Sequence, residues 1–181
     1  MLVRTQRRLP HLYAIGAPVF VTWRLHGSLP HGRFFPGGNI EGKSFLLLDA
    51  LLDQAHSGPR HLVQTDIASA VVEAIHYRQD EMRCCSIHAY VVMPNHVHVL
   101  LTPRIDLPKI MHSLKRHTAK FANQSLGVSG QPFWQAESYD HFVRTPEEFK
   151  KIKQYIEWNP VSAGLVASPD RFPYVWCEAE R

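Results

Sequence analysis

Two histidines that lie two residues apart are the first residues of this chain that could carry out chemistry. His96 and His98 follow the turn-forming pair Pro94-Asn95 and begin an apolar run that reaches Leu101. A strand alternates its side chains between its two faces, so both imidazoles point the same way. Together they can bind one divalent cation, because each ring nitrogen needs to lie only about 2.0–2.1 Å from the metal. Two ordinary surface histidines are the alternative interpretation, because short motifs often match by chance.

A tyrosine and an asparagine form a second candidate group, about sixty residues further along the chain. Tyr155 and Asn159 are four residues apart on a predicted helix, so they face the same side near its end at Pro160. A phenol is a nucleophile, and a cation can polarise a phosphoryl group for its attack. Asn159 can add a carbonyl oxygen to the two imidazoles, and such a set without thiolates suits Mg²⁺ or Mn²⁺. The alternatives are a half-buried tyrosine with a hydrated hydroxyl and a plain helix stop.

Other polar residues are weaker candidates for the same chemistry. A histidine elsewhere can supply a ligand or a proton, although surface or hydrogen-bonded histidines are more common, and a strand tyrosine is usually part of a core. These candidates are His88, His112, His117, His141 and, as a second nucleophile, Tyr139.

Length and composition predict one ordinary globular domain over residues 1–181. Hydrophobic residues make up 45% of the chain and charged residues 20%. No apolar run approaches the roughly 20 residues that a membrane span needs, and no signal-peptide stretch follows the basic N-terminal segment 1–16. Three cysteines without framework spacing indicate reduced thiols and a cytoplasmic setting. The formal net charge of +4 permits a polyanionic partner.

The hydrophobic pattern predicts an α+β fold of the ferredoxin-like βαββαβ type with an antiparallel sheet. An extra helix lies in the first crossover, and the C-terminal helix and tail, residues 145–181, carry the tyrosine. The predicted elements are a strand Val19–Leu25, a long loop 27–42, helices over Lys43–Ala55 and from Thr65 or Asp66 to near Gln79, a hairpin of Cys84–Val92 and His96–Thr102, a helix from Pro108, a strand region Phe133–Val143 and a helix from Thr145 to Trp158 or Asn159.

The helix that begins near Pro108 concentrates positive charge. Between Pro103 and Gln124 there are five lysines and arginines and one acidic residue. Their excess of four equals the formal net charge of the whole chain. This surface predicts contacts with a phosphate backbone, and a solvated helix face is the alternative. Its candidate residues are Lys109, His112, Lys115, Arg116 and Lys120.

Several of these stretches together resemble one known family. Pro94-Asn95-His96-Val97-His98, followed by the run from Tyr155 to Val166, is similar to the REP-associated tyrosine transposases, relatives of the HUH-class single-tyrosine insertion-sequence transposases. The segments Val21–Leu25, Ser113–Thr118 and Phe133–Arg144 match in the same order, so the resemblance covers most of residues 10–175.

The resemblance implies a metal-dependent single-stranded DNA endonuclease and strand transferase, which nicks and rejoins DNA. His96 and His98 are then the metal ligands, and Tyr155 attacks the scissile phosphate to give a 5′-phosphotyrosine and a free 3′-OH. Asn159 takes the place of a glutamine ligand of the insertion-sequence relatives, one methylene shorter. The implied substrate is a palindromic repeat folded as a hairpin, contacted by the basic helix and by Arg24.

Two other functions remain compatible with the residues. One is a DNA-binding protein that has lost catalysis, although His96, His98 and Tyr155 are all intact. The other is a metal phosphodiesterase that uses water, but the chain lacks the paired H-x-[ST] motifs of two-histidine phosphoesterases. We expect DNA as the partner, no membrane, no small-molecule cofactor, and a monomer or homodimer.

Overall fold

The computed structural model describes residues 2–6, 10–29, 49–53 and 58–179 of the chain. It contains both strands and helices, as the sequence pattern predicts. In chain order the elements are β1 Leu2–Gln6, β2 Pro10–Ala14, β3 Val19–Arg24, the 3₁₀ turn η1 His61–Val63, α2 Thr65–Asp80, β4 Cys85–Val92, β5 His96–Pro103, α3 Leu107–Ser125, β6 Tyr139–Phe142, α4 Pro146–Ser162, η2 Pro169–Arg171 and β7 Val175–Cys177.

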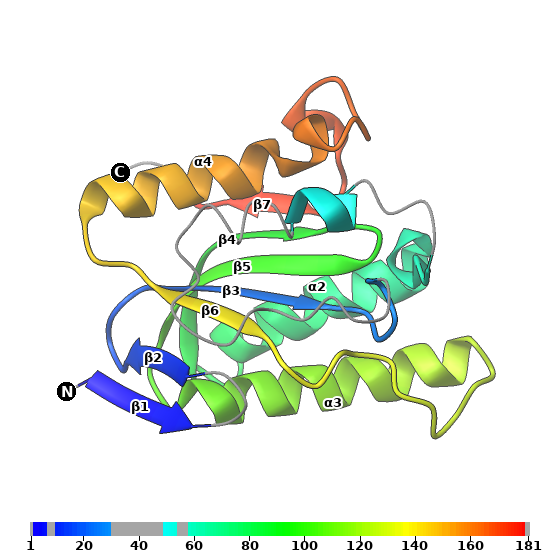
Figure 1. The fold of residues 1–181 in the computed structure, drawn as a ribbon, viewed down its shortest axis with the longest axis horizontal. Coiled ribbons are helices and arrows are strands. Elements are labelled where there is room, and N and C mark those ends of the chain that lie inside the picture. Colours follow the sequence, from blue (N-terminus) through cyan, green and yellow to red (C-terminus); the bar gives the residue numbers. More distant parts are fainter. Residues whose placement is uncertain (1, 7–9, 30–48, 54–57, 180–181) are drawn as a thin grey trace.

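The central sheet has the strand order β6-β3-β5-β4-β7, and every pairing in it is antiparallel (Figure 1). Together with α2 and α3, strands β3, β4, β5 and β6 follow the chain order β-α-β-β-α-β and take the spatial order of a ferredoxin-like sheet. The predicted α+β fold class is therefore confirmed. Residues 49–53 are helical, in agreement with the predicted extra helix of the first crossover. The rest of that helix and most of the predicted loop 27–42 lie outside the described residues.

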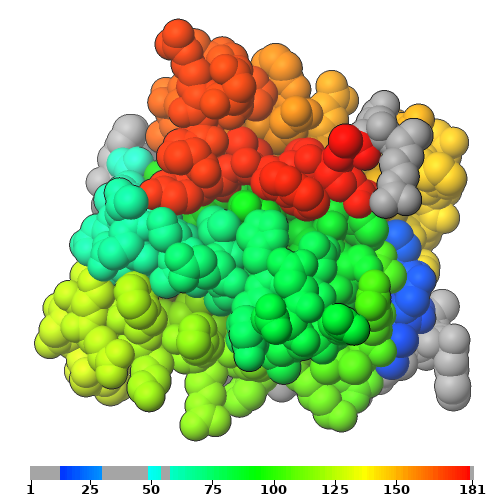
Figure 2. Space-filling view, turned by 180° about the vertical axis from the view of Figure 1, so that it is seen from behind, coloured from blue at the N-terminus to red at the C-terminus, as the bar shows by residue number. Residues whose placement is uncertain are grey.

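The two faces of the sheet support two separate cores. Val97, Val99 and Leu101 of β5 pack on the side of α2 and α3, whereas Leu100 packs on the side of α4. This follows from the two-residue alternation of a strand. Helix α4 therefore lies across one face of the sheet and α2 with α3 across the other (Figure 1). Seen from behind, α2 and α3 form the outer surface, and the C-terminal segment crosses above them (Figure 2).

Helix α4 begins where the sequence predicts and ends later. The Thr145 hydroxyl accepts a hydrogen bond from the Glu148 backbone N–H at 3.1 Å, and Pro146 occupies the first turn. The predicted end at Trp158 or Asn159 is wrong, because the helix continues through Pro160 to Ser162. The continuation is stabilised by a C-terminal turn in which Leu165 N–H bonds the Pro160 carbonyl and Gly164 adopts a positive φ of 70°.

Three further predictions need correction. The N-terminal segment 1–16 was predicted to be irregular, but its described residues include the paired antiparallel strands β1 and β2. The predicted strand region Phe133–Val143 contains a strand only at its end, in β6, with an isolated bridge between Leu25 and Trp134. The short strand β7 was not predicted, since three residues are too few to show a period.

No helix among the described residues has the length and apolar character needed to cross a bilayer.

Replacement of Ile156 by alanine should lower the free energy of unfolding by about 2–5 kcal/mol. The Ile156 side chain is fully buried between α4 and the sheet, so the substitution leaves a cavity. Denaturant unfolding followed by circular dichroism measures the change. Gln154→Ala, at an exposed position of the same helix, is the matched control and should stay within about 0.5 kcal/mol of the parent chain. Equal losses in both variants would contradict the packing described.

Candidate active site

The two histidines of β5 lie fully buried on the sheet face covered by α4. His96 pairs with Arg24 and His98 with Thr22 across the β3–β5 ladder, so both imidazoles rise from the same face. Their Nε2 atoms are 3.0 Å apart. The predicted convergence of the two rings is therefore present in the structure.

Neighbouring side chains fix the orientation of both rings through Nδ1. His98 Nδ1 lies 2.7 Å from the Thr22 hydroxyl, and His96 Nδ1 lies 2.7 Å from the amide oxygen of Asn95. The Asn95 amide nitrogen donates to the Leu52 carbonyl at 2.8 Å, so its oxygen must be the atom that faces His96. His96 consequently carries its proton on Nδ1 and directs the lone pair of Nε2 toward His98. Partners of this kind orient the histidine ligands of metal sites.

A carboxylate from the helical residues 49–53 completes the group. Asp49 is 2% exposed, and its Oδ1 lies 3.2 Å from His98 Nε2 and 3.5 Å from His96 Nε2. One ligand atom from each of the three residues lies within 4.8 Å of the other two, a separation that one cation can span. The sequence analysis missed Asp49. The available signal was a pair of acids four residues apart, Asp49 and Asp53, in an otherwise apolar stretch.

The charges in this group are compatible with a bound cation. Burial lowers the pKa of His96 to about 3, so this imidazole is neutral and can act as a ligand. Burial alone would raise the pKa of Asp49, but the nearby His98 side chain and the hydrogen bond from Asn159 hold that pKa below its ordinary value. Burial and the Asp49 charge raise the pKa of Asp53 to about 7.

Two carboxylate oxygens in this group make no hydrogen bond in the structure. These are the buried Oδ1 atoms of Asp49 and Asp53, and Asp53 Oδ1 lies 3.8 Å from His96 Nε2. A buried acceptor without a donor is costly unless a cation or an ordered water satisfies it. Imidazole nitrogens and carboxylate oxygens are both ligands that divalent cations take in proteins. The residues present therefore fit a divalent cation.

Helix α4 brings the predicted nucleophile to the same place. The Tyr155 hydroxyl donates a hydrogen bond to Asp49 Oδ2, and the Tyr155 ring packs 5.7 Å from the His98 ring, centroid to centroid. Asn159, one turn further on and 2% exposed, donates from its amide nitrogen to the same Oδ2 at 3.3 Å. Its amide oxygen is buried without a hydrogen bond. Thus Tyr155, Asn159 and the histidine pair meet around Asp49.

The weaker candidates lie away from this cluster or are held by other partners. Tyr139 is buried in the core beneath α4, and burial raises its pKa to about 12, which disfavours an attacking phenolate. The imidazole of His141 contacts Glu148 at 2.7 Å, and that of His88 contacts Glu178 at 2.8 Å. His112 and His117 belong to α3, on the opposite side of the sheet.

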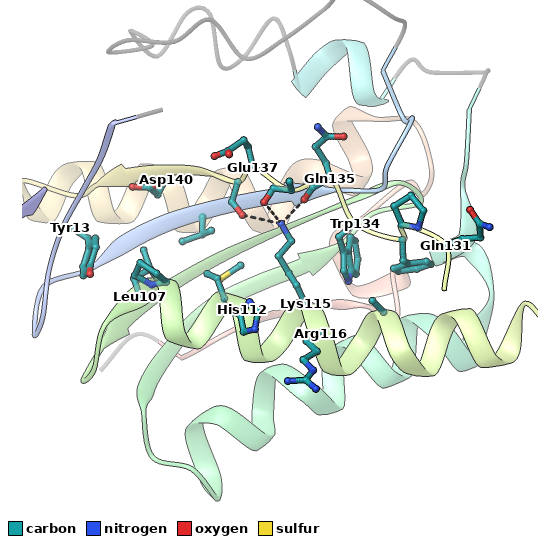
Figure 3. Close-up of a pocket in the computed structure, with 18 residues that line it drawn as sticks. Tyr13, Leu107, His112, Lys115, Arg116, Gln131, Trp134, Gln135, Glu137 and Asp140 are labelled. Atoms are coloured by element: carbon teal, nitrogen blue, oxygen red, sulfur yellow. Dashed lines mark hydrogen bonds between the residues drawn. The ribbon is translucent and has the colours of Figure 1, made fainter. Parts of the chain in front are cut away.

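The predicted DNA-contacting residues occupy two regions. On α3, Lys109, His112, Arg116 and Lys120 are exposed, and Lys109 forms a 3.0 Å ion pair with Asp106. Lys115 turns inward and donates to the carbonyls of Gln135 at 2.5 Å and Ala136 at 2.9 Å (Figure 3).

Arg24 does not belong to the α3 surface. It is 6% exposed, shares the sheet face of His96, and donates to the Ser28 hydroxyl at 3.2 Å. Any contact between Arg24 and DNA would therefore take place beside the histidine pair.

Comparison with known proteins identifies the family to which the chain belongs. A family model described as "Transposase IS200 like" matches residues 59–159. No curated protein matches the chain.

Two solved structures are similar to the chain as a whole. One is a REP-associated tyrosine transposase bound to a REP hairpin, with 18% identity, a TM-score of 0.56, and coverage of 94% of this chain and 81% of that one. The other is a candidate transposase from Deinococcus radiodurans R1, with 17% identity, a TM-score of 0.45, and coverage of 80% of this chain and 92% of that one. At 18% identity, the similarity to the first of these structures supports the fold of this chain and nothing beyond the fold.

Replacement of Asp49 by asparagine should weaken the binding of Mn²⁺ roughly tenfold or more, because one anionic ligand is lost. Isothermal titration calorimetry on the metal-free protein measures this affinity. Asp66→Asn, an exposed acid on α2, is the control and should bind Mn²⁺ as the parent chain does. Unchanged affinity in Asp49→Asn would exclude Asp49 as a ligand.

Replacement of Asp53 by asparagine should stabilise the metal-free protein above pH 7. The pKa of Asp53 is about 7 in the fold against 3.8 for the free side chain, so the fold loses stability as pH rises through this window. At about 1.4 kcal/mol per pKa unit, removal of the charge should recover roughly 2–4 kcal/mol at pH 8 and almost nothing below pH 4. Urea unfolding with a chelator present, at a series of pH values, gives the comparison. A gain of the same size at every pH would show that the charge of Asp53 is not responsible.

Proposed function

Since this chain belongs to the IS200-like transposase family, we propose that it is a metal-dependent endonuclease and strand transferase of single-stranded DNA. One observation carries the proposal. The Tyr155 phenol donates to a carboxylate whose other oxygen faces two buried imidazole nitrogens. A nucleophile and a set of metal-ligand atoms therefore meet on a single residue, Asp49.

The proposed ligands are His96, His98 and Asp49, with the amide of Asn159 as a further neighbour. A divalent cation bound there would supply Lewis-acid chemistry by polarising an oxygen of the scissile phosphate. The side chains are already directed toward the centre of the group, since Thr22 and Asn95 hold the far nitrogens of the rings. Little reorganisation is then needed when the substrate arrives.

The proposed reaction begins with Tyr155. Its hydroxyl oxygen attacks the scissile phosphorus and forms a phosphotyrosine with the 5′ end of the fragment downstream of the cut. The bond from phosphorus to the 3′ oxygen breaks, and the 3′ oxygen takes a proton from water as it leaves, so that the resulting hydroxide balances the proton that the phenol releases. The phenol proton passes to Asp49 Oδ2, the atom to which the hydroxyl already donates. The reverse attack, by a 3′-OH on the phosphotyrosine, joins the strand to a new end.

The proposed substrate is DNA that folds as a hairpin from a palindromic repeat. Its support is the exposed basic face of α3 together with the similarity to a transposase bound to a REP hairpin. Lysine and arginine side chains bind phosphates without regard to sequence, so this face would position the DNA rather than read it. One chain supplies every side chain of the proposed site, so a single subunit suffices for cleavage.

Replacement of Tyr155 by phenylalanine should abolish the covalent protein–DNA adduct and leave hairpin binding within about twofold of the parent chain. The substitution removes the attacking oxygen and keeps the ring that packs on His98. Incubation with a labelled hairpin and Mn²⁺, followed by denaturing electrophoresis, reveals the adduct, and fluorescence anisotropy measures binding.

Tyr77→Phe, at an exposed position of α2, is the matched control and should form the adduct normally. An adduct in Tyr155→Phe would disprove the assignment of the nucleophile. A parent chain that binds the hairpins but never forms an adduct would instead support a DNA-binding protein without catalysis.

A further inference from the structure

Asp53 is a mostly buried acid beside the candidate metal site, and the proposed reaction gives it no role. It lies one helical turn after Asp49, so the two carboxylates share a face of the helical residues 49–53. Its side chain is 14% exposed, and its Oδ1 lies 3.8 Å from His96 Nε2. The ligand atoms of Asp49, His96 and His98 form a compact set, and Asp53 adjoins this set on the side of His96.

The atoms that face one another in this group are almost all hydrogen-bond acceptors. His96 carries its proton on Nδ1, which bonds the Asn95 amide oxygen, so its Nε2 presents a lone pair. The Oδ1 atoms of Asp49 and Asp53 are buried and make no hydrogen bond. With both acids ionised, His98 Nε2 is the one remaining atom of the group that can carry a proton, and it can donate to one acceptor at a time. The other acceptors need a further partner, and a cation between them satisfies all of them at once.

The distances within the group are close to those between ligand atoms around one ion. Nitrogen and oxygen ligands lie about 2.0–2.2 Å from a divalent metal such as zinc, so neighbouring ligand atoms are roughly 3.0–3.5 Å apart. The two Nε2 atoms are 3.0 Å apart, and Asp49 Oδ1 lies 3.2 Å and 3.5 Å from them. The 3.8 Å between Asp53 Oδ1 and His96 Nε2 is slightly longer. Rotation about the side-chain bonds of Asp53 would bring its carboxylate into the set.

The charges of the two acids match one divalent cation. Carboxylates four residues apart on a helix repel each other when both are ionised, and burial strengthens that repulsion. Imidazoles bind a metal in their neutral form, so two imidazoles and two carboxylates around a divalent ion give a site without net charge. A neutral site costs less to bury than a charged one.

We propose that Asp53 is a fourth ligand of the cation, together with His96, His98 and Asp49. The proposal rests on the metal-dependent function proposed above and adds a residue to its site. Four protein ligands leave two positions of a six-coordinate ion such as Mn²⁺ open for oxygens of substrate or water. Because Asp49 and Asp53 belong to one helical turn, the ion would also fasten that turn to β5.

Replacement of Asp53 by asparagine should weaken the binding of Mn²⁺ roughly tenfold or more, because a neutral amide of the same size replaces an anionic ligand. Isothermal titration calorimetry on the metal-free protein, without DNA, measures the affinity. Asp80→Asn is the matched control, because Asp80 is an exposed acid at the end of α2, and it should bind Mn²⁺ as the parent chain does.

A charge that only lies near the ion would also weaken binding, so a second measurement counts the ligands. Asp53→Ala opens a position on bound Mn²⁺ that water fills, so the number of waters on the ion should rise by about one. Water proton relaxation of the Mn²⁺-saturated protein, recorded over a range of magnetic fields, reports this number. Asp80→Ala should leave it unchanged, and all variants should retain the circular dichroism spectrum of the parent chain.

Two results would overturn the fourth ligand. One is an affinity for Mn²⁺ in Asp53→Asn that equals that of the parent chain. The other is a weaker affinity in Asp53→Asn combined with an unchanged number of waters on the ion in Asp53→Ala, which would assign Asp53 a purely electrostatic effect.

Adduct formation with a DNA hairpin, measured in parallel on the parent chain, separates this proposal from the proposed function. An adduct in the parent chain, with Mn²⁺ affinity unchanged in Asp53→Asn, supports the nuclease and rejects the fourth ligand. The expected changes in affinity and water number, in a chain that forms no adduct, support the fourth ligand and reject the nuclease. A parent chain that does not bind Mn²⁺ rejects both.

Discussion

The two oxygens of the Asp49 carboxylate connect the parts of the proposed site. One oxygen faces the Nε2 atoms of His96 and His98, and the other accepts hydrogen bonds from Tyr155 and Asn159. The histidines come from the sheet, the tyrosine from α4, and the aspartate from the first crossover. Three distant segments are thus coupled through one buried side chain. Such a cluster is expensive to bury, because the polar groups of its imidazoles and carboxylates lose their water. A cation offsets this cost, which is the physical reason to regard the cluster as a ligand site.

The alternation of side chains along β5 separates the functions of the molecule. Every second residue faces α4 and includes the two histidines, while Val97 and Val99 face α2 and α3 and form the larger core. The proposed chemistry on one face would therefore leave the packing on the other face unchanged. The basic face of α3 and the cavity of about 450 Å³ between α3 and the segment 131–138 lie on the side of the sheet that α2 and α3 cover (Figure 3). DNA that contacted this side and also the proposed active site would have to pass around an edge of the sheet. Strand β6 forms the edge nearest the cavity and contributes Asp140 to its lining.

Much of the fold was predictable because local patterns and tertiary packing agree. The helices α2, α3 and α4 show apolar stripes and N-terminal signals, and β4 with β5 flank a clear turn, so their order implied a ferredoxin-like sheet. The hairpin of β1 and β2, the short β7 and the late end of α4 were not predictable in this way. Three to five residues are too few to establish a period, and the helix passes Pro160 because the turn at Gly164 satisfies its last carbonyls.

The sequence by itself determined the types of the candidate reacting groups and the faces that they share. The spacing of His96 and His98 on a strand, and of Tyr155 and Asn159 on a helix, needs only the periods of those elements. Only the tertiary structure decided that these two pairs meet, that Asp49 lies between them, and that Arg24 is buried beside them. Contacts between residues far apart in the chain depend on how helices pack on the sheet, and no local period records that packing. For the same reason, Lys115, which belongs to a basic stretch in the sequence, proved to be a support between α3 and the segment 135–138.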